Sequence, residues 1–192
     1  MQSTELDGAI TEAKRLLGQP IASKDALALF DELPAVDCDF MLGRWRGSEV
    51  ISGHSMDGLL DLVGWYGKQF IDEDNVHPLL FYRSSTRLFS VNPMTMPLGL
   101  MKYRLPRWRI YRPLLRLLRP IVGTRKGKAR LRMLEHRGKV SAAMCYDQLP
   151  INDCFRKLDD DTVLGVMDQK GAEQPYFFIL ARDDMKLILD TD

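Results

Sequence analysis

Acidic residues are missing from one long stretch of this 192-residue chain. Residues 75–134 contain no Asp or Glu but 14 Lys and Arg. The flanks are acidic: residues 1–74 hold 14 acids and 6 bases, and residues 135–192 hold 12 acids and 7 bases. The three segments therefore carry −8, +14 and −5, which gives the net charge of +1. An asymmetry of this kind indicates an anionic or lipidic partner for the basic segment.

Other absences narrow the class of protein. No run approaches the ~18–20 apolar residues of a transmembrane helix. The first residues, MQSTELDGAITEAKRLL, are polar and unlike a secretory signal, so we expect a cytoplasmic protein, at most peripheral at the inner membrane. The three cysteines match no zinc spacing and are expected to be free thiols in a reducing compartment. We expect no metal and no cofactor.

The motifs of the common catalytic machineries are also missing. The sequence has no G-x-S-x-G, no H-E-x-x-H, no glycine-rich phosphate loop and no cysteine–histidine pair at a meaningful spacing. We therefore assign no catalytic residue and favour a binding protein over an enzyme. A cofactor-free isomerase or lyase that uses Tyr146 and Asp147 stays open, because such sites leave no motif.

Short segments rich in Val, Ile, Phe and Tyr fill most of the chain and are separated by turn-forming residues. They predict strands at residues 42–51, 64–71, 78–83, 86–91, 129–136, 139–146, 150–157, 162–168 and 175–182. A short helix is expected near residues 56–62, and the tail at 183–189 is either a short helix or a last strand. Short strands joined mostly by hairpins predict a mostly β protein with an antiparallel barrel or a strongly curved sheet.

The same pattern divides the chain into four parts. Residues 1–34 are expected to form N-terminal helices, at 6–17 and from an N-cap at Ser23 to residue 33, where Pro34 ends the second helix. Residues 35–92 hold the first strand group, 93–127 form a basic insert, and 128–192 hold a C-terminal strand group that completes the same barrel. The insert is too long for an ordinary loop.

The insert contains a basic amphipathic pattern. If residues 109–122 form a helix, Arg109, Arg112, Arg116 and Arg119 fall on one narrow arc and leucines and isoleucines fill the opposite side. One hypothesis is that these arginines bind an anionic membrane surface. Another is a lid on the barrel, or a dimer contact, with the arginines solvated or paired to acids. Nucleic-acid binding is disfavoured, because the arginines alternate with large aliphatic residues and no nucleic-acid motif is present.

Several short motifs carry a family resemblance. Residues 42–47 read LGRWRG and contain the pattern G-x-W-x-G; residues 64–68 read GWYGK, 77–81 read HPLLF, and 144–168 read MCYDQLPINDCFRKLDDDTVLGVMD. Together they resemble the bacterial GXWXG-domain family, whose members carry a companion C-terminal domain of unknown function. The resemblance covers about residues 25–182. It implies a lipocalin-like or pleckstrin-homology-like barrel with affinity for lipids.

The predicted ligand is a fatty acid, a phospholipid or a similar apolar molecule. The residues expected to line or plug the cavity are Trp45, Trp65, Phe70, Phe81, Tyr146 and Phe155. Arg156 is expected to hold a buried head group, or to pair with an acid such as Asp153. A haem barrel of the nitrobindin type, with His54 or His136 as the iron ligand, is a less favoured alternative.

Overall fold

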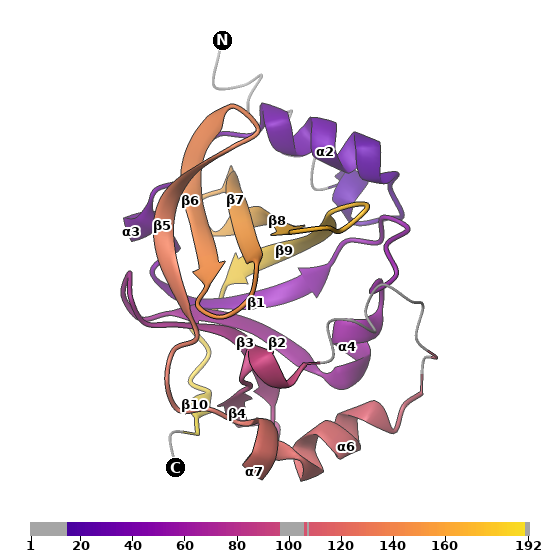
Figure 1. The fold of residues 1–192 in the computed structure, drawn as a ribbon, viewed down its shortest axis with the longest axis vertical. Helices are drawn as coiled ribbons and strands as arrows, with labels where there is room; N and C mark the ends of the chain where they lie inside the picture. The colour runs from indigo at the N-terminus through magenta and orange to yellow at the C-terminus, as the bar shows by residue number, and fades with distance from the viewer. Residues whose placement is uncertain (1–14, 97–105, 107, 191–192) are drawn as a thin grey trace.

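Both strand groups take part in one closed barrel (Figure 1). The computed structural model describes residues 15–96, 106 and 108–190. The barrel strands are β1 (Gly43–Glu49), β2 (Trp65–Phe70), β3 (Val76–Tyr82), β5 (Ala129–His136), β6 (Lys139–Tyr146), β7 (Ile151–Asp159), β8 (Thr162–Gln169) and β9 (Tyr176–Arg182). They run in the order β3-β2-β1-β9-β8-β7-β6-β5, and β3 closes onto β5 where Val76 pairs with Ala129. The predicted antiparallel barrel is confirmed.

Two short strands extend the sheet beyond the point of closure. β4 (Arg87–Ser90) pairs with β3, and β10 (Ile188–Leu189) pairs in parallel with β4. Of the two forms predicted for the tail, the strand is therefore the one that forms. Leu187, just before β10, packs with Tyr66, Leu80 and Leu88 in a small apolar cluster outside the barrel.

Short helices cover the outside and the ends of the barrel: α2 (Ser23–Glu32), α3 (Cys38–Met41), α4 (Leu59–Val63), η1 (Pro93–Thr95), α6 (Tyr111–Leu117) and α7 (Arg119–Val122). α2 buries Ala26 and Phe30 in a cluster with residues of β6 to β9. Its N-cap is Ala22, so the predicted cap at Ser23 is wrong: Ser23 is already the first helical residue. Most of the predicted helix at 6–17 lies outside the described residues. No helix of the described ranges is long and apolar enough to cross a membrane.

The basic insert forms two short helices instead of one. α7 starts at Arg119, so Pro120 opens this helix and does not end the preceding one. Proline is tolerated there, because the N–H that it lacks has no intrahelical partner in the first turn. Leu115 of α6 and Val122 of α7 pack against the interior apolar cluster and attach the insert to the barrel.

β2 departs from regular alternation. Its pairing with β3 shifts register between Trp65 and Gly67 and again between Gly67 and Gln69. Residues three apart on a regular strand face opposite sides, and a bulge changes this relation. As a result, Trp65 and Lys68 both line the barrel interior. Gly67 has φ +146°, and a Cβ there would lie 2.0 Å from the carbonyl oxygen of Trp45 on β1.

The bulge predicts a large cost for a methyl group at Gly67. Gly67→Ala combines backbone strain with a backbone clash, so the free energy of unfolding in urea should fall by about 3 kcal/mol or more. Gly138→Ala is the matched control, because Gly138 also has a positive φ (+73°) but has no atom within 4 Å of the added Cβ. Its cost should stay at roughly 1–2 kcal/mol. Equal losses in the two variants would contradict the described path of β2.

Candidate functional site

The barrel interior contains a small, largely apolar cavity. Its free volume of about 50 Å³ lies between α4, η1 and the strands β2, β3 and β6 to β9. The lining residues are Met56, Leu60, Trp65, Lys68, Leu79, Pro93, Met96, Tyr146, Leu149, Ile151, Asp153, Met167, Tyr176 and Phe178. This volume corresponds to about three or four water molecules. Only two of the lining side chains carry a formal charge, and they bind each other.

Lys68 of β2 and Asp153 of β7 form a buried ion pair. The Lys68 Nζ lies 2.7 Å from the Asp153 Oδ2, and the two side chains are 3% and 2% exposed. The ammonium also donates to the carbonyl oxygen of Pro78 at 3.1 Å. Burial raises the pKa of the Asp153 carboxyl, and the neighbouring ammonium of Lys68 opposes that rise. The pair thus places a lysine-bound carboxylate in an apolar wall.

Aromatic rings surround the ammonium group of Lys68. Its Nζ lies 5.0 Å from the centre of the Phe178 ring, 5.8 Å from that of Trp65 and 5.9 Å from that of Tyr146. Ring faces attract a cation at these distances. The Trp65 and Phe178 rings also contact each other edge to face, with 6.0 Å between their centres.

Two glycines make room for these rings. A Cβ on Gly47 would lie 2.2 Å from the Trp65 ring, and a Cβ on Gly165 would lie 2.3 Å from the Phe178 ring. Each ring therefore covers a strand at a point where no side chain intervenes. Gly47 is the second glycine of the G-x-W-x-G motif, so the motif bears directly on the geometry around Lys68.

Two polar atoms at the cavity have no partner. The Asp153 Oδ1 and the indole Nε1 of Trp65 are buried and make no hydrogen bond within the part of the chain that the structure describes. The two side chains meet at Lys68, which contacts both. Leaving a buried polar group unsatisfied costs roughly 1–3 kcal/mol, and native proteins keep few such groups. Asp153 and Trp65 thus bring one unsatisfied acceptor and one unsatisfied donor to the cavity wall.

Glu49 fixes the rim of the cavity. Its carboxylate accepts from the Tyr176 hydroxyl at 2.5 Å and from the backbone N–H groups of Leu60 and Asp61 at 3.2 and 3.0 Å. Burial raises the pKa of Glu49, and the hydrogen bond from Tyr176 acts in the opposite direction. The Tyr176 hydroxyl is thereby directed to Glu49, and α4 is held on the barrel with Leu60 in the cavity wall.

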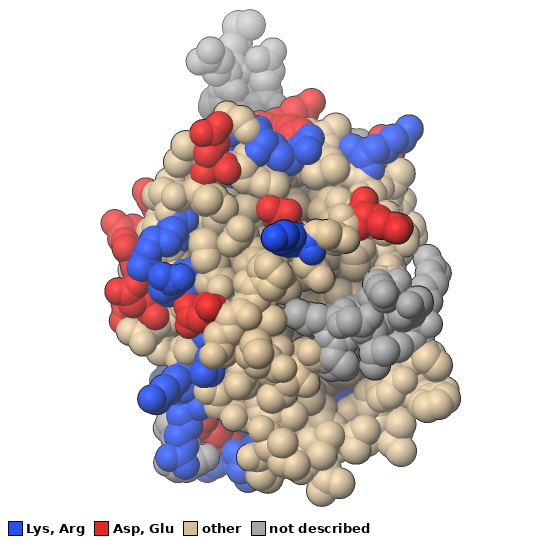
Figure 2. Space-filling view, viewed as in Figure 1, with Lys and Arg blue, Asp and Glu red and all other residues tan. Residues whose placement is uncertain are grey.

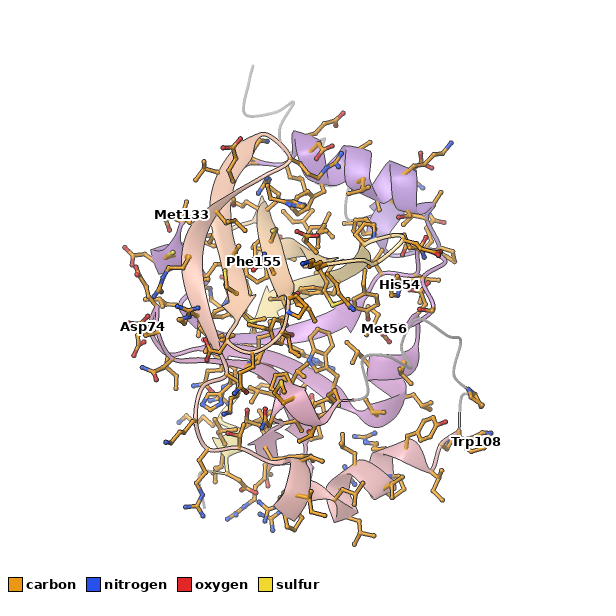
Figure 3. The ribbon with its side chains drawn as sticks, in the orientation of Figure 1. His54, Met56, Asp74, Trp108, Met133 and Phe155 are labelled. Carbon is orange, nitrogen blue, oxygen red and sulfur yellow. The ribbon has the colours of Figure 1, made fainter. Side chains whose placement is uncertain are left out.

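The structure separates the predicted ligand residues into two groups. Trp65 and Tyr146 line the cavity. The other aromatic residues, which are Trp45, Phe70, Phe81 and Phe155, are fully buried in the packed interior and are not part of the described cavity wall. Figure 3 labels Phe155, which lies among the strands of the barrel. Trp45 donates its indole N–H to the carbonyl oxygen of Met41 at 2.7 Å, and the Arg182 guanidinium lies 4.3 Å from its ring centre.

The pairing considered for Asp153 and Arg156 does not form, because residues three apart on β7 face opposite sides. Arg156 donates to the carbonyl oxygens of Phe155, His136 and Lys139, and its guanidinium lies 4.6 Å from the centre of the Phe30 ring under α2. Among the described residues it has no carboxylate partner and does not reach the cavity. Asp147 is exposed and pairs with Arg130 at 3.1 Å, also away from the cavity.

The insert arginines largely contact the protein itself. Arg112 lies over Gly64 and Tyr82, Arg116 donates to the Tyr82 carbonyl oxygen at 3.1 Å, and Arg119 pairs with Asp190 at 3.2 Å. Arg109 is exposed.

None of the described residues that line the cavity is a histidine. His54 accepts from the backbone N–H of Met56, and His136 lies 3.9 Å from Asp168.

Sequence reasoning missed Lys68. The sequence suggests Arg156 as the partner of Asp153 and indicates no role for Lys68 in the GWYGK segment. The available signal was a lysine in a predicted strand rich in aromatic residues, between Tyr66 and Phe70. The bulge that turns Lys68 inward could not be read from the sequence, because regular alternation predicts that Trp65 and Lys68 face opposite sides.

Comparisons with known proteins agree with the observed fold. The family model described as GXWXG protein matches residues 28–85, and the model of a domain of unknown function, DUF4334, matches residues 127–182. No curated protein matches the chain. A crystal structure of a protein from Thermomonospora curvata is similar, with 34% identity and a TM-score of 0.69 over 92% of this chain and 99% of the other.

The buried ion pair predicts that replacing both residues costs less stability than replacing either one alone. Lys68→Met or Asp153→Leu alone leaves one charge buried and unpaired, so the free energy of unfolding in urea should fall by ~3–5 kcal/mol. The double variant has no buried charge and should recover to within about 1–2 kcal/mol of the wild type. Asp31→Asn is the control, because the Arg137–Asp31 pair is exposed and should contribute less than ~1 kcal/mol. A double variant no more stable than the single ones would refute this account of the pair.

Proposed function

The chain belongs to the GXWXG protein family, and we propose that it binds a small, mainly apolar molecule that carries a hydroxyl group. The observation that carries the proposal is the pair of buried, unpartnered atoms at the cavity, Asp153 Oδ1 and Trp65 Nε1. A hydroxyl group donates one hydrogen bond and accepts others. The ligand hydroxyl would donate to the Asp153 Oδ1. The Trp65 Nε1–H would donate to the oxygen of that hydroxyl or to a second acceptor of the ligand.

The charge balance of the site favours a neutral head group. Asp153 already neutralises Lys68, so a fatty-acid carboxylate or a lipid phosphate would add an uncompensated negative charge beside the Asp153 carboxylate. An unpaired charge in an apolar interior is strongly disfavoured. An alcohol, a phenol or a sterol-like molecule therefore suits the site better than the fatty acid or phospholipid that the sequence suggests.

The rest of the cavity wall is apolar and suits the hydrocarbon part of the ligand. Met56, Met96 and Met167 belong to the lining, and methionine side chains adapt readily to the shape of a ligand. The free volume of about 50 Å³ suits the polar end and the first carbons of a ligand. The rest of a longer molecule would displace the methionines toward the rim formed by α4 and η1.

The proposal predicts that 1-octanol binds more tightly than octanoate at neutral pH. In a two-dimensional NMR titration, octanol should shift the indole N–H signal of Trp65, whose donor is free. The signals of Trp45, which donates to Met41, and of Trp108, which is exposed, act as internal controls. Trp65→Phe should weaken octanol binding by about 2- to 10-fold, the value of one hydrogen bond.

Two outcomes would overturn the binding proposal. One is an unchanged Trp65 signal at saturating octanol. The other is octanoate binding as tightly as octanol, which would mean that the Asp153 carboxylate does not face the ligand.

A second candidate function, a cofactor-free isomerase, draws on the same carboxylate. The raised pKa of Asp153, its unpartnered oxygen and its place in the cavity wall suit a group that removes a proton from a carbon next to a carbonyl group. Asp153 would take the role that the sequence suggested for Asp147, because Asp147 is exposed and paired with Arg130.

If the protein is an isomerase of this kind, it should catalyse exchange of hydrogens next to the carbonyl group of an apolar ketone. An apolar ketone such as 2-octanone should exchange its α-hydrogens for deuterium faster in D₂O with the wild type than with Asp153→Asn, as followed by NMR. Exchange at the buffer rate with the folded wild-type protein would eliminate this candidate.

A further inference from the structure

The two helices of the insert are turned with their apolar side outward. The exposed large apolar residues of this region are Trp108, Ile110, Leu114, Leu117, Leu118 and Ile121, which we call the outer apolar face. Leu117 is 76% exposed, Ile121 74% and Trp108 61%. A surface helix of a soluble protein normally directs such residues to the core. Trp108 projects away from the barrel at the edge of the molecule (Figure 3).

The orientation follows from the arginines on the opposite side. Arg112 lies over Gly64 and the Tyr82 ring, and the Arg116 Nε donates to the Tyr82 carbonyl oxygen. Arg119 binds Asp190, which is 9% exposed and also receives Arg83 and Arg87. These contacts occupy the charged side of α6 and α7 on the protein surface, which leaves the leucines and isoleucines facing outward.

Positive charge borders the outer apolar face. Arg109 lies at its start, and Arg125 and Lys126 follow α7; all three are exposed. A hollow of about 230 Å³ beside α7 is lined by Arg119 and Arg125 together with Thr124 and Ser90. Asp190 carries one negative charge against three arginines. Uncharged residues cover the surface over α6, with basic groups to one side of it (Figure 2).

We propose that the outer apolar face inserts into the surface of an anionic lipid bilayer, with the bordering basic residues against its head groups. Trp108 and Tyr111, whose rings lie 6.1 Å apart, supply the amphipathic rings that favour this depth of a membrane. α6 has 7 residues and α7 has 4, so both are far too short to cross a bilayer and would lie flat in the interface. The sequence pattern assigned the membrane contact to the arginines, whereas the fold assigns insertion to the opposite side of the same segment.

A bilayer fits this surface better than a second copy of the chain. Two copies joined through the outer apolar face would bring the bordering basic residues of one copy, Arg109, Arg125 and Lys126, toward those of the other. Like charges opposed across an interface disfavour association. An anionic leaflet attracts the same basic residues. The proposal does not rest on the ligand of the cavity, so either idea can fail alone.

Cosedimentation with vesicles tests the proposal. The full chain should sediment with vesicles of phosphatidylcholine and phosphatidylglycerol at low salt, and much less with phosphatidylcholine alone. Leu117→Gln combined with Ile121→Gln should lower the partition coefficient at least about tenfold, since both side chains lose apolar burial in the bilayer. The matched control is Met133→Gln combined with Val140→Gln, on β5 and β6, where the residues are also exposed (47% and 52%) and binding should not change.

A charge variant and an oligomer measurement complete the test. Arg125→Gln combined with Lys126→Gln should weaken binding to the anionic vesicles and reduce its salt dependence. No binding to anionic vesicles at low salt would overturn the proposal, as would binding that Leu117→Gln/Ile121→Gln leaves unchanged. A dimer in light scattering that this variant abolishes, together with no vesicle binding, would assign the face to a second copy instead.

Discussion

The ion pair between Lys68 and Asp153 joins β2 to β7 across the barrel interior, and most of the cavity is arranged around it. Two opposite charges removed from water lose several kcal/mol of hydration each, and their attraction offsets this loss only when the geometry is good. Apolar side chains of similar volume would stabilise the interior about as well. Stability alone therefore does not account for the pair. A carboxylate held in an apolar cavity with one oxygen free gives a reason for it.

The glycines of the barrel are part of this arrangement. Gly47 and Gly165 leave space for the rings of Trp65 and Phe178, and these rings flank the ammonium of Lys68. Gly67 lets β2 change register, and this change brings Lys68 and Trp65 to the same side. The G-x-W-x-G motif thus contributes twice: Trp45 anchors the end of the barrel through Met41, and Gly47 positions the ring that lies over the ion pair.

The architecture could be predicted from the sequence because it depends on local patterns. Alternating apolar residues and turn residues predicted the barrel strands to within a few residues. The same pattern allowed either a barrel or a strongly curved sheet, and the pairing of β3 with β5 closes the barrel. Trp65 and Tyr146 could be chosen as candidates because large aromatic residues on strands tend to face the interior. Trp45, Phe70, Phe81 and Phe155 satisfy the same criterion, but they fill the core without reaching the cavity. The sequence pattern does not distinguish aromatic residues that line the cavity from those that fill the packed core.

The ion pair, the direction of Arg156 and the orientation of the insert could not be predicted from the sequence, because they depend on contacts between distant segments. Lys68 meets Asp153 only because a bulge alters one strand, and Arg156 turns away because β7 alternates regularly. The amphipathic pattern of the insert was visible in the sequence, but which side faces the barrel is decided by the Tyr82 carbonyl and by Asp190. Hydrophobicity alone would have turned the leucines inward.

The central claim is that the free oxygen of Asp153 receives the polar group of an apolar ligand. A crystal structure of the protein grown with 1-octanol tests it directly. The account predicts that the alcohol oxygen lies about 2.7–3.2 Å from the Asp153 Oδ1 while Lys68 stays bound to the other oxygen. Octanol bound elsewhere, or bound in the cavity with its oxygen turned away from Asp153, would contradict it.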